Sequence, residues 1–96
     1  MTKADLVSNI SDQLGIDKTD VQATVESLMG EIKNSLENGE NVYLRGFGSF
    51  IIKTRAEKTG RNISKNVAVK IPAHNIPAFK PAKVFTNSVK SKVEVA

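Results

Sequence analysis

The chain has 96 residues, no cysteine and a hydrophobic content of 40%. This length is typical of one domain, residues 1–96, and so small a domain buries a modest share of its surface, so that self-association is one way to gain burial. The lack of cysteine excludes disulfides and thiolate chemistry and fits a reducing compartment. The N-terminal stretch has no long apolar run, which predicts neither a signal peptide nor a membrane anchor, and we expect a cytoplasmic protein.

The net charge of +4 is distributed unevenly along the chain. Residues 1–40 contain three Lys/Arg and eight Asp/Glu, a net charge of −5, whereas residues 41–96 contain eleven Lys/Arg and two Asp/Glu, a net charge of +9. Such an asymmetry indicates a polyanionic partner for the second part of the chain. Nucleic acid is the first candidate and an anionic membrane surface the second, while the plain alternative is a solvated basic face.

Two helices are predicted within residues 3–38. Thr2 and Asp5 have the spacing of a capping box, and Gly15 ends the first helix. Apolar residues then recur at helical spacing. They are Leu6, Val7, Ile10 and Leu14 in the first helix, and Val21, Val25, Leu28, Met29, Ile32 and Leu36 in the second. A connection of about three residues predicts an antiparallel helical hairpin.

The second helix has its own boundary signals. Asp17 and Asp20 repeat the start signal of the first helix, and Gly39 suits the left-handed position just after a helix end. Gly30 lies inside this helix, where it costs about 1 kcal/mol relative to Ala. We interpret it as the site of a close helix crossing.

After residue 40 the hydrophobic period changes to about two, which predicts strands at residues 41–45, 49–56 and 67–71 with a tight turn at 46–48. Three prolines make residues 72–81 edge-like or irregular, because proline lacks an amide donor. A last helix is expected at residues 83–91. The predicted fold is α+β: a helical hairpin, a three-stranded antiparallel sheet within residues 41–76, and a short C-terminal helix.

Residues 53–74 are too poor in apolar side chains to cover a core, so we expect this part of the hairpin to project as a basic arm. Its cations are Lys53, Arg55, Lys58, Arg61, Lys65 and Lys70, against the single acid Glu57. An isolated two-stranded ribbon is marginal in water, and we expect the arm to be mobile until a partner orders it. Lys and Arg would neutralise DNA phosphates, and Arg61 and Asn62 could reach into the minor groove.

Ile63 lies at the expected tip of this arm, among polar residues. An aliphatic side chain there could enter a base step and kink the duplex, as in minor-groove architectural proteins. It could equally fold back onto Val67 or another part of the hairpin. The residues alone leave both interpretations open.

The sequence resembles the HU/integration host factor family of bacterial nucleoid-associated DNA-bending proteins. The motifs GFGSF (residues 46–50), RA (55–56), GRN (60–62) and IPAFKP (76–81), followed by Lys83, occur in family order, and the combination is specific. The resemblance covers residues 1–90 and implies an intertwined dimer with a helical base, a saddle of sheets and two arms in the minor groove. It implies a dimer core that includes Leu44, Phe47, Phe50 and Phe79. The expected DNA-binding residues are Lys3, Lys53, Arg55, Lys58, Arg61, Asn62, Ile63, Lys65, Lys70, Lys80 and Lys83.

Two features depart from the family pattern. The family usually has proline after the GRN motif, and Ile63 keeps the apolar bulk of a wedge with more side-chain freedom. The usual Gln-Thr-Gly turn is replaced by Ser64-Lys65-Asn66, in which Asn66 could adopt the left-handed conformation. The residues after Lys90 extend beyond the common end and receive no role.

We expect a nucleoid homodimer that binds double-stranded DNA with low sequence specificity and bends and compacts it. A sequence-preferring bender like integration host factor is the nearest alternative, and a heterodimer with a paralogue stays open. RNA-binding modules usually carry aromatic platforms, which this chain lacks. An enzyme is disfavoured because the lone His74 is interpreted as solvated or capping, and no metal-ligand cluster or phosphate-binding glycine loop occurs. We expect no cofactor, metal or small-molecule substrate. A membrane-surface role is disfavoured because it needs a basic amphipathic helix, whereas the basic residues of this chain lie mostly on predicted strands.

Overall fold

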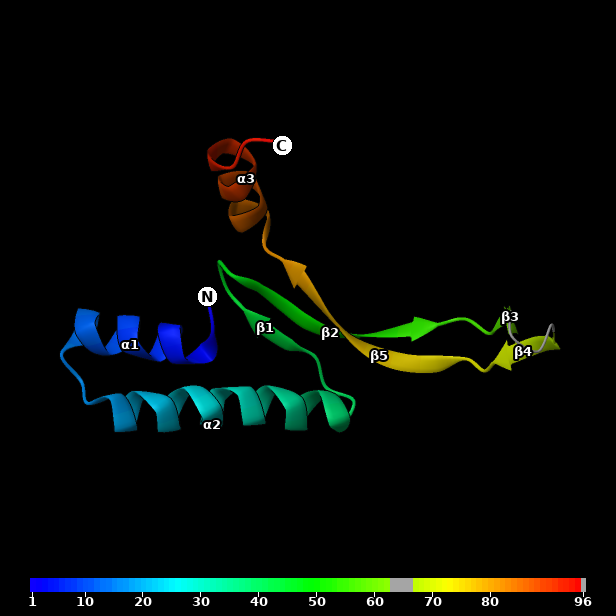
Figure 1. Ribbon diagram of the computed structural model, residues 1–96, viewed down its shortest axis with the longest axis horizontal. Helices are drawn as coiled ribbons and strands as arrows, with labels where there is room; N and C mark the ends of the chain where they lie inside the picture. The colour runs from blue at the N-terminus through cyan, green and yellow to red at the C-terminus, as the bar shows by residue number, and fades with distance from the viewer. Residues whose placement is uncertain (63–66, 96) are drawn as a thin grey trace.

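The computed structural model describes residues 1–62 and 67–95, without the side chains of residues 61, 62 and 67. The elements in chain order are α1 (Lys3–Leu14), α2 (Lys18–Glu37), β1 (Val42–Leu44), β2 (Gly48–Arg55), β3 (Lys58–Asn62), β4 (Val67–Ile71), β5 (His74–Pro81) and α3 (Lys83–Lys92). Helix α2 lies below a small sheet, and α1 lies to the left of the sheet, above the first part of α2 (Figure 1). A ribbon extends from the sheet to the right, and α3 lies above the left end of the sheet. With extents of 57 × 35 × 28 Å, the chain is elongated. The predicted α+β fold is confirmed.

Helix α1 begins with the predicted capping box. The Thr2 amide donates to Asp5 Oδ2 at 2.9 Å, and the Asp5 amide donates to Thr2 Oγ1 at 3.3 Å. The helix ends at Gly15, which has a φ of 66° and donates its amide to the Ser11 carbonyl. Both boundaries follow from the need to satisfy the free backbone groups at helix ends.

Helix α2 confirms one boundary signal and corrects two expectations. Gly39 has the left-handed φ of 82°. Asp17 stands at the N-cap, but its side chain makes no capping hydrogen bond. A Cβ on Gly30 would meet nothing within 4 Å beyond the backbone of its own helix, so the expected close crossing is wrong within this chain. The ion pair between Lys3 and Glu26 places the start of α1 beside Glu26, one turn before Gly30. Helix α1 therefore does not extend as far as Gly30.

The sheet has the order β1-β2-β5 and is antiparallel, while β3 and β4 form a separate two-stranded sheet. The third strand of the main sheet is therefore β5, and the assignment of that place to residues 67–71 is wrong. Residues 74–81 are also not irregular, since all eight pair with β2. The edge-like interpretation of this segment is confirmed. Pro77 and Pro81 are tolerated because β5 has only one neighbouring strand, so an amide can be missing on its open side.

The single chain has almost no core. Within the described residues, the buried apolar side chains are Val7 at 5% exposure and Val21 at 4%, where α1 packs on α2. The phenylalanines instead form a row from the sheet to α3, with ring centroids 5.0 Å apart for Phe50–Phe79, 5.2 Å for Phe79–Phe47 and 5.6 Å for Phe47–Phe85. This row is incompletely covered, with Phe47 46% exposed.

The glycines of the GFGSF motif permit this row. Gly46 has a φ of 81°, in the left-handed region that favours glycine. A Cβ on Gly48 would lie 2.6 Å from Phe79 Cε1 and 2.7 Å from the Lys80 carbonyl oxygen. The Phe79 ring can therefore pack against the β2 backbone only because Gly48 has no side chain.

Candidate nucleic-acid interface

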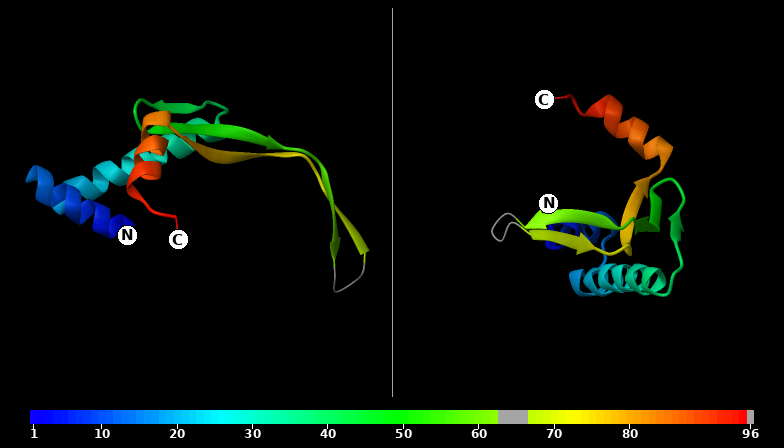
Figure 2. Two further views of the ribbon diagram at one scale, coloured as in Figure 1. Left: turned by 90° about the horizontal axis from the view of Figure 1, so that it is seen from above. Right: turned by 90° about the vertical axis from the view of Figure 1, so that its right-hand side faces the viewer.

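The two antiparallel ladders form one long ribbon with a single interruption. Strands β2 and β5 pair from Gly48 opposite Pro81 to Arg55 opposite His74. Pairing resumes with Lys58 opposite Ile71 and continues along β3 and β4. Residues 56–57 and 72–73 are left out of the ladders, so each strand loses two residues and the register is the same on both sides. The ribbon turns at this interruption (Figure 2, left).

The register assigns the cations of the ribbon mostly to one face, because side chains alternate along a strand and paired residues share a face. One face of the inner ribbon, formed by β2 and β5, carries Phe50, Ile52, Pro77 and Phe79. The opposite face, here called the basic face, holds the register positions of Lys53, Arg55, His74 and Lys80, and in the outer ribbon of β3 and β4 that of Lys70. Lys58 falls on the first face.

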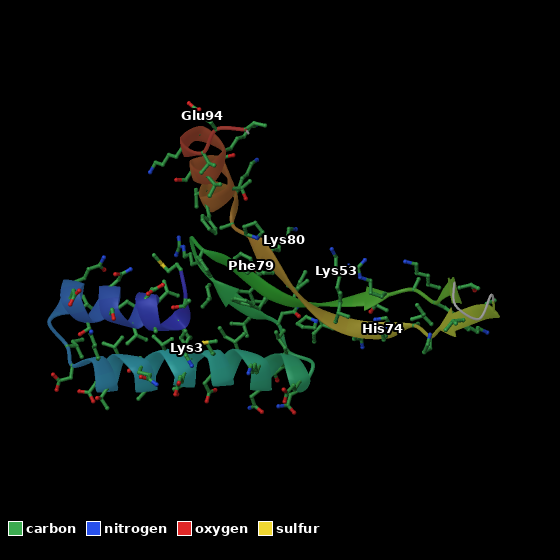
Figure 3. The ribbon with its side chains drawn as sticks, in the orientation of Figure 1. Lys3, Lys53, His74, Phe79, Lys80 and Glu94 are labelled. Atoms are coloured by element: carbon green, nitrogen blue, oxygen red, sulfur yellow. The ribbon has the colours of Figure 1, made fainter. Side chains whose placement is uncertain are left out.

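The arm cations whose side chains are described are all exposed, but they differ in their partners. Lys53, Arg55 and Lys58 make no ion pair with any described side chain, whereas Lys70 Nζ lies 2.9 Å from Glu57 Oε1. Unpaired exposed cations on a narrow ribbon can approach phosphates without first losing a protein partner. The ribbon extends away from the rest of the chain, and Lys53 and His74 lie along it (Figure 3).

The body cations that were predicted to bind DNA lie in two separate places. Lys80 and Lys83 line an open groove with Tyr43, Arg45 and Gly48, at the end of the sheet next to α3. The sequence analysis missed Arg45 and Tyr43 as candidates; the signal that could have found them is their position directly before the GFGSF turn. Both are exposed, and Arg45 extends the positive surface of the ribbon onto the body.

Lys3 belongs to the helical base and not to this groove. Its Nζ lies 2.9 Å from Glu26 Oε1, which joins α1 to α2. The hydrogen bond from Lys3, helped by one from Gln22 and by the charge of Lys3, lowers the pKa of Glu26. The structure therefore shows Lys3 in an ion pair within the base, and its place in DNA binding stays a prediction.

His74 has a local partner in the backbone. Its Nδ1 lies 3.0 Å from the Pro72 carbonyl oxygen, and since a carbonyl only accepts, Nδ1 carries the proton in this contact. The interpretation of this histidine as a solvated or capping side chain is confirmed. Within residues 1–62 and 67–95, no three His, Cys, Asp or Glu residues are grouped as a metal site.

Two of the expected site residues lie outside the described part of the chain, namely Ile63 and Lys65. Arg61 and Asn62 are described only by their backbone in β3, opposite Ala68 and Val67. No helix in the described residues is long and apolar enough to cross a membrane.

The residues expected in a dimer core gather on one side of the sheet. Leu44 and Phe50 are half-buried, whereas Phe47 and Phe79 are exposed. The stacking of Phe85 on Phe47 adds a member that the sequence analysis had assigned only to the last helix.

A helical base, a small antiparallel sheet and a long ribbon with a basic face together define an α+β protein with an exposed basic arm. A family model described as bacterial DNA-binding protein matches residues 1–90. The chain belongs to this family, the family of HU.

Two curated relatives and one solved structure illustrate the similarity. The DNA-binding protein HU of Thermus thermophilus is 41% identical over 90 residues, covering 94% of this chain and 93% of its own. The DNA-binding protein HU-alpha of Salmonella typhimurium is also 41% identical over 90 residues, covering 94% of this chain and all of its own. The Anabaena HU–DNA cocrystal structure superposes with a TM-score of 0.89 at 32% identity, covering 93% of this chain and 97% of the other. The last six residues of this chain lie beyond the matched family region.

Proposed function

We propose that this protein binds double-stranded DNA with little sequence preference, and that it bends and compacts the duplex through arms in the minor groove. The observation that carries the proposal is the exposed ribbon with Lys53 and Arg55 at successive positions of one face. Cations on such a ribbon neutralise phosphates and release counterions, which gives affinity without base readout. The fold similarity to an HU chain solved with DNA supports this assignment.

The acting unit we propose is an intertwined homodimer. Beyond the small contact between α1 and α2, the chain leaves large apolar side chains exposed on three elements: Leu28 at 52% on α2, Phe79 at 40% on β5 and Val84 at 67% on α3. Such an apolar surface is unusual for a soluble monomer and is typical of an interface. Leu44, Phe47, Phe50 and Phe79 would form its centre. A two-fold axis would then supply two arms, one for each side of the duplex.

Ile63 is proposed as the wedge at the tip of each arm. An aliphatic side chain that enters a base step unstacks it and kinks the duplex, and the bent DNA then contacts more of the protein. Compared with the proline usual in the family, isoleucine loses more side-chain freedom on insertion, so we expect a bend that is present but less sharply defined. Lys80, Lys83 and Lys3 would meet the flanking phosphates. The proposed location is the nucleoid in the cytoplasm.

The experiment that tests this function is end-to-end energy transfer in a labelled duplex of about 35 base pairs, a length that accommodates a protein-induced bend. Saturable binding with a rise in transfer is expected for unrelated sequences. Strong preference for one sequence would replace low specificity with the sequence-preferring alternative. Binding without a rise would contradict bending.

The role of the wedge needs its own variant. Ile63→Ala should keep most of the affinity, which comes from phosphates, and reduce the transfer at saturation. Val95→Ala is the matched control, because it removes an aliphatic side chain that is 99% exposed and lies beyond the matched family region. Equal transfer from both variants would remove Ile63 from the mechanism.

A further inference from the structure

We infer that Glu57 and Lys70 form a brace across the interruption of the ribbon, which sets the direction of the outer ribbon, so that Lys70 serves the protein and not the DNA phosphates. The ion pair joins residue 57, which lies in the unpaired gap, to a residue of β4, on the far side of that gap. It therefore connects the two chain segments where the ladder hydrogen bonds are missing. The DNA part of this inference rests on the proposed function.

The interruption has a backbone cause. Pro72 has no amide to donate to the ladder, and it lies in the unpaired segment 72–73 opposite residues 56–57. Because the losses are equal, the outer ribbon keeps its register but is joined to the inner ribbon by two unpaired connections. Two unpaired connections side by side form a hinge unless other contacts fix the angle.

Side-chain contacts lie on both sides of the gap. On the inner side, Thr54 Oγ1 donates to Asn75 Oδ1 at 2.8 Å across the last pairs of β2 and β5. Within the gap, His74 Nδ1 donates to the Pro72 carbonyl oxygen at 3.0 Å. On the outer side, the only described contact of this kind is the pair between Glu57 and Lys70.

The presence of an acid in this place needs a reason. Glu57 is the only Asp or Glu between Glu40 and Glu94. A carboxylate on a ribbon that meets phosphates repels them and so opposes binding. Its presence therefore calls for a structural use that offsets this repulsion. Its contact with Lys70 supplies that use and also neutralises the lysine. The pair is weak because its side chains are 51% and 75% exposed. A two-stranded ribbon is itself only marginally stable, so even a small stabilising energy changes the fraction of molecules in which the outer ribbon is formed.

The first test needs no DNA. Hydrogen exchange of the β3 and β4 amides should be about two- to fivefold faster in Glu57→Gln and in Lys70→Gln, the range expected for an exposed ion pair. The double variant Glu57→Lys with Lys70→Glu reverses the pair at constant net charge and should restore the original rates. Glu94→Gln removes an acid outside the ribbon and should change nothing. Unchanged rates in both single variants, or no restoration by the reversed pair, would overturn the brace.

The second test separates a brace from a phosphate contact. Lys53→Gln should reduce the salt dependence of DNA binding by about 0.9 in the logarithmic slope, the value for one phosphate contact. Lys70→Gln should leave that slope nearly unchanged and instead lower the energy transfer of a saturated duplex, which the reversed pair should restore. A loss of slope equal to that of Lys53→Gln would overturn the inference. If the unaltered protein does not bind DNA, the proposed function fails while the exchange experiment still decides the brace.

Discussion

The helical base and the arm are both incomplete in the single chain, but they lack different things. The base has a net charge of −5 over residues 1–40, and what it leaves open is apolar surface. The arm has a continuous register and exposed cations, and what it leaves open is positive charge. The comparison teaches that one chain can need two different partners, one to cover apolar surface and one to neutralise positive charge. Burial by a second copy would complete the base, and neutralisation by a polyanion would complete the arm.

The largest expected effect is on the free energy of unfolding, when a side chain of the exposed apolar surface is removed. Phe79 is 40% exposed in the single chain, and the proposed dimer would bury its ring, which lies between those of Phe47 and Phe50. Phe79→Ala should therefore lower the free energy of unfolding of the dimer by about 3 kcal/mol, as for a buried aromatic side chain. Chemical denaturation at several protein concentrations measures this loss together with dimer dissociation. Tyr43→Ala is the control, since Tyr43 is 71% exposed. Equal losses in the two variants would show that no second copy covers the phenylalanine row.

The next effect separates two glycines. Gly48→Ala should destabilise by about 2 kcal/mol, because the new Cβ would overlap the Phe79 ring and the Lys80 carbonyl. Gly30→Ala should instead stabilise by up to about 1 kcal/mol, since it lies in a helix with open space around it. Thermal and denaturant unfolding measure both. If Gly30→Ala instead destabilises the protein, a helix of a second copy must pack closely against Gly30 in the dimer.

A charge variant on the arm should leave the base untouched. Arg55→Gln should weaken DNA binding about three- to tenfold at low salt and reduce the logarithmic salt slope by about 0.9. The free energy of unfolding should stay within about 0.5 kcal/mol of the original, as for an exposed surface substitution. Binding titrations at several salt concentrations measure the first effect. An equal loss from Lys92→Gln, on the last helix, would show that net charge and not the ribbon determines affinity.

The smallest expected effect lies in the base. The hydrogen bond from Lys3 lowers the pKa of Glu26, so the pair adds stability when Glu26 is ionised, at neutral pH, and this stability is lost as the pH falls through the lowered pKa. The free energy of unfolding of Glu26→Gln should therefore be lower than that of the original protein at neutral pH, and the difference should become smaller as the pH falls. Unfolding measured from neutral to acidic pH follows this change. A difference that is independent of pH would mean that the ion pair contributes nothing.

Local chemistry made the helix ends predictable. The capping box at Thr2 and the left-handed glycines that follow the two helices, at positions 15 and 39, depend on residues a few positions apart, so the sequence shows them directly. The basic arm was predictable for a similar reason, because six cations and one acid in so short a segment cannot cover a core.

Long-range pairing was not predictable in the same way. The prolines at 77 and 81 favour an irregular segment by themselves, and only the pairing of β5 as an edge strand explains how they fit. Gly30 likewise reads as a packing position until the start of α1 beside Glu26 is known. Lys70 counts as one more arm cation in the sequence, and its contact with Glu57 appears only in three dimensions.

The equal loss of two residues from each strand at the interruption limits how the arm can change its length. A change of one residue on each strand would exchange the two faces of the outer ribbon and turn its lysine and arginine positions to the opposite side. A change of two residues on each strand would keep the faces and move the tip by about 7 Å, at roughly 3.3 Å per residue. The length of the arm can therefore be changed without exchanging its faces only in steps of two residues on each strand, and arms of different lengths built on this base should differ by multiples of four residues.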